Sequence, residues 1–107
     1  MNLDKRTELI ELFDIYSELL TEKQKSYFED YYYMDLSLSE IADNYDVSRN
    51  AVFDMLKKTE QILQNYEEKL KIHQKNEKIL NILKNSDYFD EIKNIIEEWS
   101  YGIWRTI

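Results

Sequence analysis

The stretch LSLSEIADNYDVSRNAVFDML, residues 36–56, has the pattern of a helix-turn-helix motif. Ser37 can cap a first helix whose third residue, Glu40, reaches back to it, and Ser48 can cap a second helix directly after a tight turn. Asp46 stands where the backbone must become left-handed, a conformation that Asp tolerates better than most non-glycine residues. The segment therefore predicts two capped helices that meet at a sharp turn, with the motif at residues 37–57.

Apolar residues at helical spacing give these two helices a shared core. Ile41 and the small Ala42 face inward from the first helix, and Val47 fills the turn. The second helix contributes Val52, Met55 and Leu56. An ordinary helical hairpin gives a similar pattern, but the agreement of caps, turn and spacing favours the motif. The motif alone does not establish nucleic-acid binding.

The composition favours one all-helical domain over residues 1–107. The chain has no proline, a single glycine at Gly102, 43% hydrophobic and 34% charged residues, which is typical of helices rather than turn-rich sheets. It has no cysteine for a disulfide or thiolate metal site, and no apolar run as long as a signal peptide or membrane span. We therefore expect an all-α, cytoplasmic protein without membrane insertion.

The charge distribution is uneven. The net charge is −8, which opposes binding to phosphate, yet basic side chains outnumber acidic ones within residues 47–85. This segment contains the second helix of the motif. Its charge is compatible with an electrostatic footprint for nucleic acid and equally with the ordinary variation of a solvated surface.

Two helices are predicted before the motif. The first runs from a cap at Asp4 to about Leu20. The second opens with a capping box in which Thr21 pairs with Gln24. It carries three consecutive tyrosines, residues 31–33, which we interpret as core packing rather than a platform for base stacking.

A long helix is predicted from Arg49 to about His73. Apolar positions alternate at steps of four and three along it, at Val52, Leu56, Thr59, Leu63, Tyr66, Leu70 and His73. We call this set the heptad stripe. It needs a partner surface, which is either a second copy of the chain or the chain's own C-terminal segments. The dimer hypothesis predicts a homodimer interface at Leu56, Leu63, Tyr66 and Leu70.

A C-terminal helical extension is predicted over residues 75–107. Residues 75–84 are amphipathic, and Asn85, Ser86 and Asp87 separate them from a last helix. That helix has a wide apolar stripe that continues toward the C-terminus, at Tyr88, Phe89, Ile92, Ile95, Ile96, Trp99, Trp104 and Ile107. We expect it to dock on the long helix or on a partner.

The sequence contains no pattern of catalytic residues, so we expect a non-enzymatic protein without cofactor or metal. His73 is the only histidine, and a metal site needs several converging donors. We therefore interpret His73 as a packing or surface residue. The single glycine leaves no glycine-rich loop for phosphate.

Several short elements resemble the YlxM family of small bacterial proteins. They are LTEKQ at 20–24, LSLSEIA at 36–42, VSR-AV at 47–52 and Y-EKL at 66–70, and the resemblance covers about two-thirds of the chain. It implies an all-helical fold with a helix-turn-helix similar to region four of bacterial sigma factors. It also implies a regulator of the signal recognition particle pathway, because genes of this family lie beside those of the particle's GTPases.

The similarity to sigma region four implies which residues would meet nucleic acid. Arg49 and Asn50 would contact base edges, and Lys57 and Lys58 would contact the backbone. Asp54 faces the same groove, where an acid repels phosphate unless it accepts from a cytosine amine.

Two functional hypotheses follow. In the first, the motif contacts DNA or a structured RNA. In the second, the chain is a protein-interaction module whose acidic N-terminal flank and long helix bind a basic partner, such as a signal recognition particle component.

Overall fold

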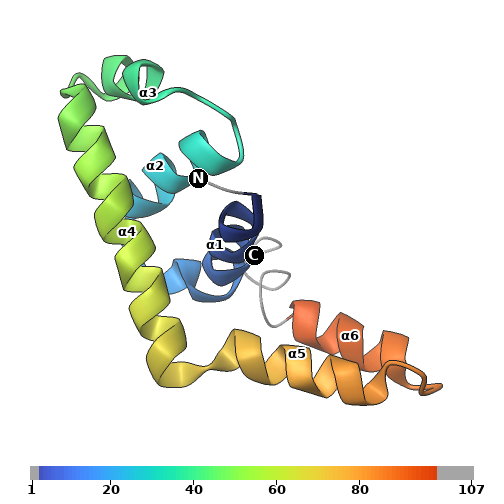
Figure 1. Ribbon diagram of the computed structural model, residues 1–107. Coiled ribbons are helices and arrows are strands. Elements are labelled where there is room, and N and C mark those ends of the chain that lie inside the picture. Colours follow the sequence, from blue (N-terminus) through green and yellow to red (C-terminus); the bar gives the residue numbers. More distant parts are fainter. Residues whose placement is uncertain (1–2, 99–107) are drawn as a thin grey trace.

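The computed structural model describes residues 3–98, and these residues form helices without strands (Figure 1). The elements are α1 (Leu3–Tyr16), the 3-10 turn η1 (Ser17–Leu19), α2 (Glu22–Tyr32), α3 (Leu38–Tyr45), α4 (Arg49–Leu70), α5 (Ile72–Leu83) and α6 (Phe89–Glu97). The all-α prediction is confirmed. The predictions for Trp99, Trp104 and Ile107 lie outside the described residues.

Helix α4 is the longest element, and the other helices are arranged along it (Figure 1). Helix α3 joins one end of α4, and α1 and α2 pack against its side. Helices α5 and α6 form a hairpin beyond its other end. The helix-turn-helix and the C-terminal hairpin therefore lie at opposite ends of an elongated molecule, with principal extents of 51 × 28 × 23 Å.

The start of the chain differs in detail from the prediction. Asp4 lies within the first turn of α1 rather than at its cap. The helix ends at Tyr16, and η1 follows, where the sequence predicted one helix to Leu20. The tighter turn ends in extended backbone at Leu20, whose side chain is buried in the core. Thr21 is then placed to begin α2.

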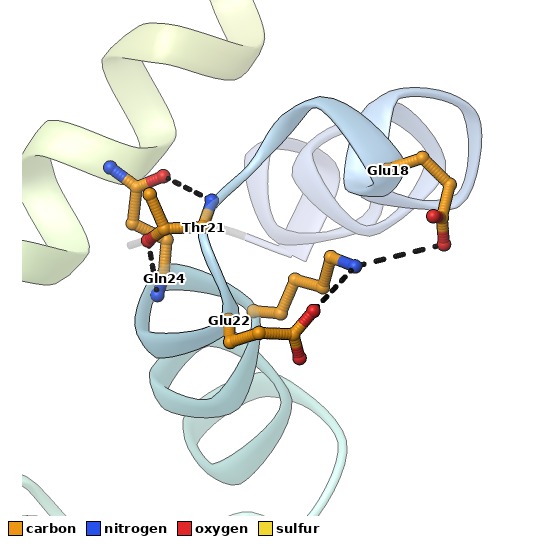
Figure 2. A network of polar contacts seen from close by, with 5 residues as sticks. Glu18, Thr21, Glu22 and Gln24 are labelled. Atoms are coloured by element: carbon orange, nitrogen blue, oxygen red, sulfur yellow. Dashed lines mark hydrogen bonds and ion pairs between the residues drawn. The ribbon is translucent and has the colours of Figure 1, made fainter.

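The start of α2 is the capping box predicted from sequence (Figure 2). The Thr21 hydroxyl accepts from the Gln24 amide at 3.2 Å, and the Gln24 side-chain oxygen accepts from the Thr21 amide at 3.0 Å. Lys25 forms ion pairs with Glu18 at 3.7 Å and Glu22 at 3.3 Å. The two hydrogen bonds between Thr21 and Gln24 satisfy backbone donors that would otherwise have no partner at the start of a helix.

The main core lies where α1 and α2 pack on the middle of α4. Phe13 and Phe28 stack with ring centroids 4.3 Å apart. The buried members of this core are Leu9, Leu12, Phe13, Tyr16, Leu20, Phe28, Tyr32 and Leu63. Leu63 is the contribution of α4, and its side chain is 0% exposed.

This core corrects the interpretation of the heptad stripe as a dimer interface. Leu56 is 3% and Leu63 0% exposed within one chain, because α1, α2 and α3 already cover them. Tyr66 stacks on Tyr16 with ring centroids 5.9 Å apart, and Leu70 alone of the four is exposed, at 44%. Leu56 and Leu63 are therefore core residues, not contacts for a second copy. A homodimer as such stays a prediction.

The long helix ends at Leu70 rather than near His73, because Lys71 adopts the left-handed conformation with φ 57°. Glu67 stabilises the new direction: its carboxylate accepts from the backbone amides of His73 at 3.1 Å and Gln74 at 3.0 Å. The Tyr16 hydroxyl donates to the same carboxylate at 2.6 Å. Glu67 thus caps α5 from the preceding helix, which supplies the cap that the Lys71 side chain does not provide.

His73 follows this break and contacts α1 instead of continuing the heptad stripe. Its Nε2 lies 2.9 Å from a Glu11 carboxylate oxygen. The sequence-based interpretation of His73 as a packing or surface residue agrees with this position.

We predict that Leu63→Asp destabilises the protein by about 3–5 kcal/mol, because a carboxylate without a partner would replace a buried side chain. Denaturant unfolding followed by circular dichroism measures this loss. Gln64→Asp introduces the same charge at the exposed neighbouring position and should cost far less. Equal stability of both variants would contradict the burial of Leu63.

We also predict that Glu67→Ala lowers the free energy of unfolding by about 1–3 kcal/mol, because α5 loses its cap and the buried Tyr16 hydroxyl loses its acceptor. The exposed neighbour Glu68 provides the control. If Glu68→Ala has the same effect on unfolding, Glu67 has no special role at the junction of α4 and α5.

Candidate nucleic-acid interface

The helix-turn-helix has the local geometry that the sequence predicted. The Ser37 hydroxyl accepts from the Glu40 amide, and the Glu40 carboxylate accepts from the Ser37 amide, both at 3.1 Å. Asp46 is left-handed with φ 56° and ψ 48°. The Ser48 hydroxyl accepts from the Ala51 amide at 3.0 Å. The start of each motif helix is therefore fixed by a side chain close in sequence, and α3 ends at the left-handed backbone of Asp46.

A second core holds the two motif helices together and against α2. Its buried members are Tyr27, Ile41, Ala42, Val52 and Leu56. Val47 and Met55 pack at its edge, as the spacing predicted. Because the buried side of α4 is fixed in this way, its opposite side is held in a defined orientation toward solvent.

All five residues predicted to meet nucleic acid lie on the surface. Arg49, Asn50, Asp54, Lys57 and Lys58 are exposed within the first three turns of α4. One amide, one carboxylate and three cationic side chains thus lie along the first turns of α4, at one end of the molecule. Their contact with nucleic acid stays a prediction.

The exposed side of α4 continues as a polar surface beyond the motif. Gln61, Gln64 and Asn65 are exposed, and they follow Asn50, Asp54 and Lys57 at helical spacing. Amide side chains donate and accept hydrogen bonds without adding charge. The sequence analysis did not single out these residues. The sequence feature that could have identified them is the repeat of polar residues on the side of the helix opposite the heptad stripe.

Lys57 is held by two neighbours. Its Nζ lies 3.7 Å from a Glu60 carboxylate oxygen and 5.6 Å from the centre of the Phe53 ring. Phe53 is 45% exposed, which is unusual for a large aromatic side chain. Beside it lies a shallow groove of about 80 Å³, lined by Tyr31, Leu38, Phe53, Leu56, Lys57 and Glu60.

Glu60 connects this surface to the core. Its carboxylate is buried and accepts from the Tyr32 hydroxyl at 2.8 Å. Burial raises the pKa of Tyr32 well above its ordinary value, and the hydrogen bond to the Glu60 carboxylate raises this pKa further. Tyr32 thus belongs to the core, as predicted. Tyr33 lies at the surface, where its hydroxyl donates to Asp14 at 2.8 Å.

Residues 3–98 contain no group of three or more His, Cys, Asp or Glu side chains placed to hold a metal ion. Within the same range, no helix has both the length and the apolar character needed to cross a membrane.

Comparison with known proteins places the chain among small bacterial helix-turn-helix proteins. Residues 3–99 match the family model described as "Putative helix-turn-helix protein, YlxM / p13 like". A UPF0122 protein of Mycoplasma capricolum is 46% identical over 104 residues, which are 95% of this chain and 91% of the relative. The UPF0122 protein YlxM of Bacillus subtilis is 48% identical over 104 residues, 91% of this chain and 94% of the relative.

We predict that Tyr32→Phe destabilises the protein by about 1–3 kcal/mol near neutral pH, because the buried Glu60 carboxylate loses a donor. Because the pKa of Tyr32 is raised on folding, this contribution is present below the ordinary tyrosine pKa of 10.0 and is lost as the pH rises above it. The stability difference from wild type should therefore narrow in alkaline solution.

Chemical unfolding at a series of pH values measures this difference. Tyr33→Phe, at the exposed neighbouring hydroxyl, should cost less and serves as the matched control. A Tyr32→Phe difference that stays constant through the alkaline range would contradict the assignment.

Proposed function

This chain belongs to the YlxM / p13-like family of helix-turn-helix proteins, and we propose that it binds a nucleic-acid duplex through the start of α4. In this proposal the protein is a non-enzymatic regulator of the signal recognition particle pathway. The resemblance of its LTEKQ, LSLSEIA and VSR-AV elements to that family supports the pathway. The ligand is DNA or the structured RNA of the particle.

The observation that carries the proposal is the composition and exposure of the first turn of α4. This turn contains Arg49 and Asn50 and no acidic residue, whereas the first turn of α3 contains Glu40. The amino end of a helix carries a partial positive charge that favours phosphate, and Arg49 adds a full charge there. Both side chains are exposed, and the Ser48 hydroxyl caps the helix that carries them.

The surrounding charge makes the proposed binding weak and sensitive to salt. Asp43 and Asp46 are exposed on the first motif helix and its turn, and Asp54 is exposed on α4 itself. These carboxylates oppose the approach of phosphate and offset part of the attraction from Arg49 and Lys58. Asp54 favours only a site where it accepts a hydrogen bond from a cytosine amine.

A second candidate function is supported by Phe53 and its groove. A protein ligand can bury an exposed aromatic ring, and Lys57 and Glu60 beside it offer polar contacts at the rim. In this case the motif positions a protein-binding surface, and the partner is a signal recognition particle GTPase.

The test is a titration of the protein with duplex DNA, with the particle RNA and with the purified GTPase at two salt concentrations. Lys58→Ala is the cleanest variant, because Lys57→Ala also removes the cation beside the buried Glu60 carboxylate. We expect Lys58→Ala to weaken binding to all sequences and to reduce the salt slope by about 1. Arg49→Ala should change the sequence preference as well.

Lys69→Ala is the control, because Lys69 is an exposed lysine in the last turn of the same helix. It should leave binding unchanged. Binding that survives the combined loss of Arg49, Lys57 and Lys58 would place the contact surface elsewhere. If the protein binds the GTPase and neither nucleic acid at low salt, the second candidate function replaces the first.

A further inference from the structure

The C-terminal hairpin of α5 and α6 has one side turned toward α1. A pocket of about 180 Å³ lies there. Helix α1 lines it with Glu11, helix α5 with His73 and Glu77, and helix α6 with Glu97. The contact of the His73 Nε2 with the Glu11 carboxylate, at 2.9 Å, joins the hairpin to α1 on this side.

The other side of the hairpin carries exposed apolar residues. Ile82 is 83% and Tyr88 65% exposed, and Ile79 and Ile95 are also exposed. On α5, helical spacing places Ile79 and Ile82 across the helix from His73 and Glu77, which line the pocket. On α6, Ile95 lies across from Glu97 in the same way, and Tyr88 is the residue directly before this helix. We call these four exposed residues the hairpin face.

The two edges of the hairpin face carry opposite charges. Lys71, Lys75 and Lys78 follow the α5 edge, and all three are exposed. Glu91 and Glu98 follow the α6 edge, and both are exposed. The hairpin face is therefore basic along α5, where Lys75 and Lys78 lie on the same side of the helix as Ile82, and acidic along α6.

We propose that the hairpin face binds the hairpin face of a second copy of this chain. A two-fold axis parallel to the helices places α5 of one copy over α6 of the other, so each basic edge meets an acidic edge. Because α5 and α6 run antiparallel, every neighbouring pair in the resulting four-helix arrangement is also antiparallel. A two-fold axis across the helices would instead oppose like charges. The charge pattern thus selects both the partner and the orientation.

The positions of the charged residues along the length of the hairpin agree with this orientation. Lys75 and Glu98 lie at nearly equal distances along the chain from the turn at Ser86, so they are at a similar height in the hairpin. A two-fold axis along the helices keeps that height and brings Lys75 of one copy near Glu98 of the partner subunit. The dimer interface is thus at the opposite end of the molecule from the helix-turn-helix.

Sedimentation over a range of micromolar concentrations tests the proposal. Wild type should approach twice the chain mass, and Ile82→Asp should raise the dimer dissociation constant about tenfold or more. Asn81→Asp adds the same charge one residue away, on the side of α5 that the proposal leaves in solvent, and should have little effect. Circular dichroism of both variants confirms that each remains folded.

A charge exchange tests the orientation separately. Lys75→Glu and Glu98→Lys should each weaken the dimer several-fold, and the double variant should recover most of the loss. A monomer at all concentrations, or a dimer insensitive to Ile82→Asp, would overturn the proposal. A dimer that depends on Ile82 but shows no recovery in the double variant would overturn the orientation.

Discussion

The packing of Leu63 and its neighbours on α4 against α1 and α2 is the contact on which the rest of the structure depends. Leu63 belongs to the main core, and Leu56 and Val52, about two and three helical turns earlier, belong to the motif core. One side of a single helix therefore joins both cores. This side also buries Thr59 and Glu60, whose polar atoms bond to the Met55 carbonyl and the Tyr32 hydroxyl. Burial without such partners would be costly.

Because the apolar side of α4 is used within the chain, the proposed interactions fall at the two ends of the molecule. The opposite side of α4 is polar and carries Lys58, and Arg49 is exposed at the start of the helix. The turn at Lys71 redirects the chain, and Glu67 fixes the start of α5 there. A continuous helix would instead have carried residues 72–83 away from α1. The break is thus what exposes the hairpin face as a separate surface.

The features that the sequence predicted well are those set by residues close together in the chain. The caps at Thr21, Ser37 and Ser48 and the left-handed Asp46 each depend on contacts within a few residues. The end of α4 could not be predicted, because it needs the Tyr16 hydroxyl, 51 residues before Glu67. The periodicity predicted that the side of α4 with Leu56 and Leu63 is buried. It did not show whether the same chain or a second copy covers that side. The exposure of Arg49 and Lys58 could be predicted from the motif. The contacts of Lys57 could not, because they depend on where its side chain lies relative to the Phe53 ring in the folded protein.

Amide hydrogen exchange at two protein concentrations tests most directly whether α4 is covered within one chain. The amides of α4 around Leu56 and Leu63 should be among the most protected, and dilution should leave their protection unchanged, because α1, α2 and α3 cover them in every copy. Protection in α5 and α6 should fall on dilution as the hairpin face separates. Loss of protection around Leu63 on dilution would contradict the account, because that side of α4 would then be covered by a second copy.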